Sequence, residues 1–322
     1  DHRDLHSFPT RRSSDLNWLA SAGAVCAFYL LAREVEVPAL PAAAAFTVAN
    51  PAWVLLSSAP HAEPLAMAAT LLCFVAYARG SLPWSVVWLA LAFLARYPAI
   101  LVGAALAFDA LVVRGDRRLR TWAWLGLPIG VFAAHHAYLA WRVPGFAGLW
   151  DAHQVQWDAT LTLPYAELWK YWSYANHETH QFPIIYATVA FYTLATFAGF
   201  RRAERARWWL AVWAGIVLLF HVSLRGEPGV ESFTRLAILA WPPALLVAWR
   251  LAMEVGPRAL RARPVAAKAA LVVVLVALGA NGVRLGTLWI RGAIYLQSGR
   301  DWMQPKLESL DDDAPQWTDF EA

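Results

Sequence analysis

Charged residues are scarce in this chain of 322 residues: Asp, Glu, Lys and Arg make up 16% of it, and apolar residues make up 59%. Soluble globular domains carry about 25% charged and about 45–50% apolar residues. With a mean hydropathy of +0.41, the shortage of charge excludes an ordinary soluble domain. It predicts a protein whose solvent is the lipid bilayer.

Cysteine is also scarce, since the chain has only Cys26 and Cys73, each inside an apolar run. A thiol in such a run behaves as a small apolar group, so no disulfide framework is expected. The sequence also lacks a basic stripe interleaved with stacking aromatic residues, and we expect no nucleic-acid partner. We attribute the net charge of +4 to membrane topology and to attraction for anionic lipid headgroups.

What the chain does have is arginine, gathered in three clusters at every second connection between apolar runs. The clusters are Arg114/Arg117/Arg118/Arg120, Arg201/Arg202/Arg205/Arg207 and Arg250/Arg258/Arg261/Arg263. The connections at 143–182 and 225–234 instead collect Trp, Tyr, His, Asp and Glu. This alternation is the positive-inside pattern, which predicts that the clusters face the cytoplasm and the other two connections face the extracytoplasmic side.

The lengths of the apolar runs predict an all-α, polytopic membrane protein with about ten transmembrane helices. We expect helices near 18–32, 38–59, 64–79, 84–95, 97–113, 121–142, 183–200, 207–224, 234–253 and 266–289. Three prolines and Asn50 predict an irregular helix in 38–59. The sequence Arg96-Tyr97-Pro98 predicts a helix break, because proline lacks an N–H and restricts the residue before it.

The two ends of the chain are treated apart from the transmembrane domain, which we assign to residues 17–290. Residues 1–16 resemble a translated sequencing adapter and are excluded from fold reasoning. We therefore expect an N-terminally truncated protein whose missing segment ended outside. Residues 291–322 are expected to form an extracytoplasmic tail.

The loop 143–182 holds the largest group of polar and aromatic residues. Pro164 and the sequence that follows it, Tyr165–Ser173, suit an amphipathic helix lying in the membrane interface. Such a rim suits a site for a lipid-linked substrate. An aromatic belt that only anchors the protein in the membrane would look the same.

The most specific local pattern lies in Asn50–Leu65. There an apolar helix is expected to end at Ser57/Ser58, a short outward turn displays His61 and Glu63, and a new helix begins at Pro64. This turn resembles the serine–aromatic–x–glutamate turn of polyprenyl-phosphate-sugar-dependent glycosyltransferases of the GT-C superfamily, particularly the glycosylphosphatidylinositol mannosyltransferase II-like branch. His61 stands where an aromatic residue, usually Tyr, is common.

Three further segments resemble motifs of that family, so that the resemblance spans roughly 45–250. They are Leu91–Pro98 with Arg96, the segment Gln154-Val-Gln-Trp157 with Pro164, and Glu231-Ser-Phe-Thr-Arg235 through Trp241-Pro242. Thr234 replaces a common proline.

The resemblance implies an integral membrane glycosyltransferase of the plasma (inner) membrane, mannosyltransferase-like, with its active face extracytoplasmic. It would transfer a sugar with inversion from a polyprenyl-phosphate donor to a glycan or lipid acceptor. The family's catalytic carboxylate lies in the first extracytoplasmic loop, upstream of Asn17, so we expect this fragment to be inactive. Asp151 and Asp158 are the candidates within this sequence for assisting catalysis.

Such a transfer needs a general base, cations that hold the leaving phosphate, and a groove for the isoprenoid tail. The candidate substrate-binding residues are His61, Glu63, Arg96, Gln154, Trp157, Arg225 and Arg235. Arg235 is the first choice for the phosphate, because a guanidinium matches phosphate bidentately. Each of these residues also has a structural interpretation. Arg225 and Arg235 could only reach lipid headgroups or pair with Glu227 or Glu231. Glu63 could pair with Arg96.

Other readings of the sequence stay open. His177 and His180 could join Asp151 and His153 in a metal site, but we predict no metal and leave the cofactor unknown. A transporter or lipid flippase is the competing function. The scarcity of acidic residues in mid-membrane, where Asp109 is the one candidate, counts against it. A non-enzymatic scaffold is the third possible function. A polar crevice at the outer face favours the transferase, and a cavity at the midplane favours transport.

Overall fold

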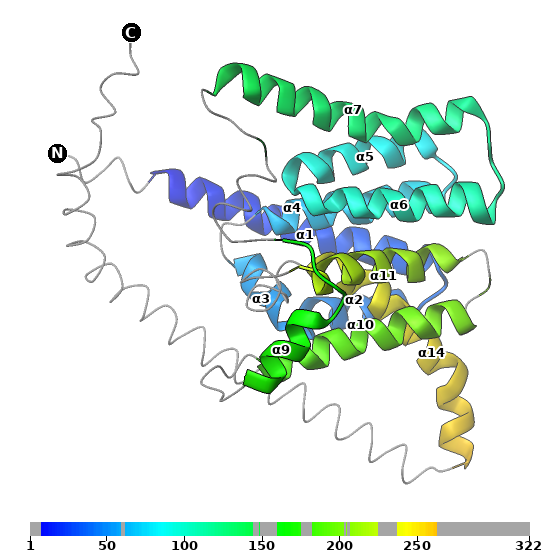
Figure 1. Ribbon diagram of the computed structural model, residues 1–322. Helices are drawn as coiled ribbons and strands as arrows, with labels where there is room; N and C mark the ends of the chain where they lie inside the picture. The colour runs from blue at the N-terminus through cyan, green and yellow to red at the C-terminus, as the bar shows by residue number, and fades with distance from the viewer. Residues whose placement is uncertain are drawn as a thin grey trace, which may run out of the picture. The chain divides into compact units, whose positions relative to one another are not determined.

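The computed structural model describes residues 8–58, 62–143, 148, 160–174, 182–202, 204, 207–224 and 237–262. All of them belong to the first of two units, Asp1–Ala267 and Lys268–Ala322. In this part of the chain every regular element is helical, and an isolated antiparallel bridge between Leu161 and Leu224 is the one β contact (Figure 1). The prediction of an all-α protein is confirmed to this extent.

The first three helices are α1 (Phe8–Glu34), α2 (Ala39–Val48) and α3 (Pro51–Ser58). α1 thus begins inside the segment 1–16. The irregular helix predicted in 38–59 is two helices that break at Asn50. Its Oδ1 accepts a hydrogen bond from the backbone N–H of Trp53 at 3.2 Å, which caps the first turn of α3, and Pro51 occupies the first helical position, where proline is favoured.

The next elements are α4 (Glu63–Ala78), α5 (Leu82–Ala95), a 3₁₀ turn η1 (Tyr97–Ala99), α6 (Ile100–Phe108) and a π-helical turn η2 (Asp109–Val113). Gly80, with φ +78°, makes the turn between α4 and α5, a conformation that glycine adopts without strain. The predicted break falls at Arg96, whose backbone is extended at φ −152° and ψ 118°.

The remaining described helices are α7 (Leu119–Arg142), α9 (Ala166–Tyr174), α10 (Phe182–Arg202), α11 (Trp208–Val222), η4 (Ala237–Ala240) and α14 (Trp241–Ala262). α7 lies beside α5 (Figure 1). α9 is the helix predicted after Pro164. The span expected at 266–289 lies outside the described residues, as does the expected tail 291–322.

Stacked aromatic rings and small residues hold the helices together. The ring of Phe74 on α4 stacks on Trp213 of α11 with centroids 4.1 Å apart, a contact worth about 0.5–1.5 kcal/mol beyond burial. α10 and α11 approach closely, since a Cβ on Gly215 would lie 2.8 Å from Cγ2 of Thr196. Small residues at such contacts are typical of helices that pack in membranes.

Two described helical segments, Asp15–Glu34 and Ala237–Glu254, are long and apolar enough to cross a bilayer. The shorter apolar helices are Ala39–Val48, Glu63–Ala78, Leu82–Ala95, Tyr97–Val113 and Trp208–Val222. Length and composition therefore identify two candidate spans, and the arrangement with about ten spans stays a prediction.

Candidate functional site

Arginines from distant parts of the chain meet at one end of the helices, around the turn that follows α1. Arg79 Nε lies 2.8 Å from Glu34 Oε1 and Arg207 Nη2 lies 2.6 Å from Glu36 Oε2. Arg250 Nη1 donates to the carbonyl oxygen of Val35 at 2.8 Å. Arg207 and Arg250 belong to the second and third arginine clusters, so these clusters share one end of the helices, which we call the arginine end.

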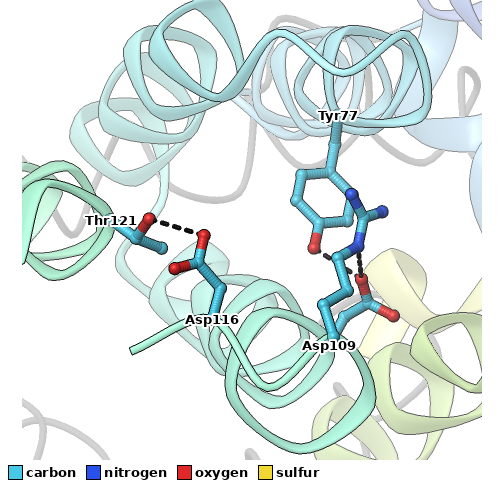
Figure 2. A network of polar contacts seen from close by, with 5 residues as sticks. Tyr77, Asp109, Asp116 and Thr121 are labelled. Atoms are coloured by element: carbon cyan, nitrogen blue, oxygen red, sulfur yellow. Dashed lines mark hydrogen bonds and ion pairs between the residues drawn. The ribbon is translucent and has the colours of Figure 1, made fainter. Parts of the chain in front are cut away.

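The first cluster joins the same end through a network on α4 and η2 (Figure 2). The Tyr77 hydroxyl donates to Asp109 Oδ2 at 2.5 Å, and Arg114 Nε donates to the same oxygen at 2.7 Å. Figure 2 also shows the adjacent turn, where the Thr121 hydroxyl donates to Asp116 Oδ2 at 2.9 Å. Tyr77 lies two residues before Arg79, which pairs with Glu34 at the arginine end. Arg114, from the first cluster, shares Asp109 with Tyr77 and therefore lies at this end too. All three clusters thus have a member at the arginine end.

Glu63 and Arg96 meet at the opposite end, which we call the polar end. They lie there because α4 and α5 form an antiparallel hairpin: the start of α4 comes beside the end of α5. Arg96 Nη1 lies 3.0 Å from Glu63 Oε1, and the side chains are 21% and 2% exposed. The pairing of Glu63 with Arg96, one of the alternatives drawn from the sequence, is thus present in the structure.

Local structure favours this pair. Glu63 is the first residue of α4 and Arg96 caps the C-terminus of α5. A carboxylate at a helix N-terminus and a cation at a helix C-terminus are both stabilised by the helix dipole. The break at Arg96 turns its backbone out of the helix, which brings its side chain toward α4.

His221, near the end of α11, is a third ionisable residue at the polar end. It is 1% exposed, its Nδ1 lies 2.7 Å from the carbonyl oxygen of Val217, and it lies within electrostatic reach of Arg96. His221 is not among the site residues predicted from the sequence. An ionisable residue inside an apolar run is a functional candidate by default. The sequence around His221 therefore already marks it as a candidate.

The segment before α9 lies across the end of α11, next to His221. The backbone N–H groups of Thr162 and Tyr165 donate to the carbonyl oxygens of Ser223 and Val222, both at 2.8 Å. Tyr165 has φ +64°, which is unfavourable for a residue with a bulky side chain. Its hydroxyl lies 3.2 Å from Oγ1 of Thr193 on α10, so contacts on both sides fix the strained turn.

An open apolar groove begins at this turn. Its volume is about 360 Å³, and its walls are Tyr165, Leu168 and Trp169 from the region of α9 with Tyr186 and Val189 from α10. The Tyr186 hydroxyl donates to the carbonyl oxygen of Leu168 at 2.7 Å, which ties the two walls together. Nearly all of the lining is apolar, which suits a hydrocarbon chain.

Of the site residues predicted from the sequence, the structure brings together Glu63 and Arg96. His61, Gln154, Trp157, Arg225 and Arg235 lie outside the described residues, and so do Asp151 and Asp158. Within the described ranges no three His, Cys, Asp or Glu side chains gather as metal ligands would.

Comparison with protein-family models, with curated proteins and with solved structures gives no significant match for this chain.

Proposed function

We propose that this chain belongs to an integral membrane glycosyltransferase of the GT-C type, which transfers a sugar from a polyprenyl phosphate to an extracytoplasmic acceptor with inversion. The observation that supports the proposal best is the ion pair of Glu63 and Arg96, at the end of the helices opposite the three arginine clusters. In this proposal the chain crosses the membrane about ten times.

The positive-inside rule gives the two ends their sides of the membrane. With the arginine end in the cytoplasm, the polar end faces the extracytoplasmic side, where the acceptor and the sugar of the donor would meet. Glu63, Arg96 and the turn at Tyr165 then share one compartment, as a site for a lipid-linked substrate requires.

The groove and the guanidinium suit the two parts of a polyprenyl-phosphate donor. The apolar groove beside α9 takes the isoprenoid chain, and Arg96 stabilises the phosphate as negative charge develops on it. Glu63 orients the Arg96 side chain through their ion pair. Arg235, from the Glu231–Arg235 motif, and Arg225, from the connection before it, join this site in the proposal, because a guanidinium matches phosphate bidentately.

A transporter or lipid flippase is the second candidate, and the buried carboxylate of Asp109 is the observation that favours it. Asp109 is 0% exposed within an apolar segment, where acidic residues often mark ion pathways. Its contacts with Tyr77 and Arg114 at the arginine end support a structural role instead, because both partners hold the carboxylate in place.

Sugar transfer is tested with membranes that contain this chain or the gene product extended upstream of Asn17. Each is incubated with radiolabelled polyprenyl-phosphate mannose and assayed for labelled glycan or lipid. Turnover by the extended product supports the proposal. Coupled solute uptake, without turnover of any polyprenyl-phosphate sugar, would establish transport instead.

Substitutions at Arg96 and Arg235, with one at Arg142 as the control, test the donor site in whichever product turns over the donor. Arg96→Gln is expected to raise the KM for the donor at least tenfold, since charge-assisted hydrogen bonds contribute about 1.5–3 kcal/mol. Arg142→Gln at the exposed end of α7 removes the same charge and is expected to leave donor kinetics unchanged. Arg235→Ala should weaken donor use without loss of expression, and unchanged kinetics would remove Arg235 from the site.

A further inference from the structure

The turn between η2 and α7 carries the first arginine cluster on its surface. The four exposed arginines of this turn are Arg114, Arg117, Arg118 and Arg120. Asp116 fixes the turn from within, since its carboxylate accepts hydrogen bonds from the backbone N–H of Arg118 at 3.0 Å and from the Thr121 hydroxyl at 2.9 Å (Figure 2). A single short segment thus holds four guanidinium groups close to one another.

Two of these arginines have a carboxylate partner and two have none. Arg114 and Arg118 each have an aspartate nearby, with N–O distances of 2.7 Å and 4.0 Å. In the part of the chain that the structure describes, neither Arg117 nor Arg120 has a carboxylate within 4.0 Å. The surface of the turn therefore has an excess of positive charge, which suits an anionic partner.

Exposed apolar side chains stand among the arginines. Leu119 is 84% exposed and Trp122 is 47% exposed. They lie about one turn of α7 apart and so share a face of the helix. A soluble anion would compensate the arginines but leave both apolar side chains in water. A phospholipid surface accepts both, because an indole ring at the membrane interface places its apolar body at the level of the headgroups.

We propose that residues 114–122, which we call the basic turn, bind anionic phospholipid of the cytoplasmic leaflet. Arg117 and Arg120 contact the lipid phosphates, and Leu119 and Trp122 lie against the upper part of the acyl chains. Basic segments next to a membrane helix bind anionic headgroups in this way. The bound lipid holds the start of α7 at the cytoplasmic surface. The inference rests on the membrane orientation proposed above and does not depend on sugar transfer.

The test uses the complete chain, purified in neutral detergent and titrated with phosphatidylglycerol or phosphatidylcholine, with bound lipid counted by native mass spectrometry. Phosphatidylglycerol is expected to bind in preference to phosphatidylcholine. The double variant Arg117→Gln with Arg120→Gln should weaken its binding about twenty- to thirtyfold, because each basic residue near an anionic lipid surface contributes about fivefold. Both residues are exposed, so the fold is expected to stay intact. Equal retention of the two lipids would overturn the proposal.

Arg201→Gln with Arg202→Gln is the matched control, because it removes the same charge from two exposed residues at the end of α10, also at the arginine end. It should leave phosphatidylglycerol binding unchanged. Equal weakening by the two double variants would overturn the proposal in favour of a diffuse basic surface.

A substitution at Leu119 separates a lipid from a soluble anion. Leu119→Ser should weaken phosphatidylglycerol binding about tenfold, because it withdraws an apolar side chain from contact with hydrocarbon. Its exposure means that the fold does not depend on it. Unchanged binding by this variant, or displacement of the lipid by glycerol phosphate at equal concentration, would overturn the proposal in favour of a site for soluble anions.

Discussion

Glu63 and Arg96 form an ion pair of 3.0 Å in which the carboxylate is almost completely buried and the guanidinium reaches the surface. They lie 33 positions apart in the chain and meet because the α4–α5 hairpin returns the end of α5 to the start of α4. Burial makes each charge depend on the other, since an unpaired charge in an apolar setting is costly. The pair thus stabilises the hairpin as well as forming the polar end.

The first prediction concerns the stability that this pair provides. Glu63→Gln is expected to lower the free energy of unfolding by about 1.5–3 kcal/mol, because it removes a charge-assisted contact with Arg96, whose guanidinium is partly exposed. Unfolding of the purified chain in mixed micelles, followed by circular dichroism against increasing SDS, measures the change.

A double-mutant cycle separates the pair from its surroundings. The variant Glu63→Gln with Arg96→Gln should be less destabilised than the sum of the two single variants, because neither charge is then left alone. Additive losses would show that the two side chains do not depend on each other.

Elements set by local chemistry could be predicted from the sequence. Three prolines and Asn50 predicted an irregular helix in 38–59, where the structure has the two separate helices α2 and α3. Pro98 predicted the break at Arg96, because proline changes the backbone directly. The shared position of the arginine clusters followed from the charge pattern. In each case the residues that carry the signal lie within the segment whose structure they determine.

Contacts between distant segments could not be predicted in the same way. Glu36 meets Arg207 across 171 positions, and nothing local to either residue identifies the partner. Asn50 likewise contacts the Tyr192 hydroxyl through packing of α10. His221 stands out in the sequence as an ionisable residue inside an apolar run, but its nearness to Arg96 depends on how α11 packs and could not be predicted.

The second prediction concerns the close approach of α10 and α11. Gly215→Ala places a Cβ 2.8 Å from Cγ2 of Thr196, and the stiff β-branched side chain cannot easily move away. We expect a loss of about 1–3 kcal/mol in unfolding free energy, as for other overpacked contacts, measured by the same SDS titration.

Gly130→Ala on α7 is the matched control, because a Cβ there meets no atom within 4 Å. Replacing a helical glycine by alanine at an open position is expected to stabilise by about 0.5–1 kcal/mol. If the two variants behaved alike, close packing at Gly215 would not limit the contact.

The third prediction is the sidedness on which the proposed function depends. Single cysteines at Ala62, Leu163 and Arg118, all exposed positions, are introduced after Cys26 and Cys73 are replaced by alanine. A membrane-impermeant maleimide is expected to label positions 62 and 163 from the extracytoplasmic face and position 118 from the cytoplasmic face. Labelling of 62 and 163 from opposite faces would separate the parts of the polar end.

The fourth prediction concerns acid and the turn between η2 and α7. The pKa of Asp116 is held below its ordinary value because the backbone N–H of Arg118 and the Thr121 hydroxyl donate to its carboxylate. A pKa lowered by folding means that the unfolded chain takes up the proton first as the pH falls. The stabilisation is therefore complete above the pKa of the unfolded chain and is lost as the pH falls through the lower pKa of the folded protein.

Thermal unfolding between neutral pH and pH values below the ordinary range of an aspartate measures this loss. Asp116→Asn cannot titrate, so its melting temperature should fall less over that interval than that of the unsubstituted chain. Thr121→Val removes one of the two donors and should give an intermediate dependence, because the Arg118 N–H still favours the charged carboxylate. If Asp116→Asn and the unsubstituted chain lost stability equally, the acid sensitivity would arise at other carboxylates, with Glu36, whose pKa is lowered mainly by its hydrogen bond with Arg207, as the next to substitute.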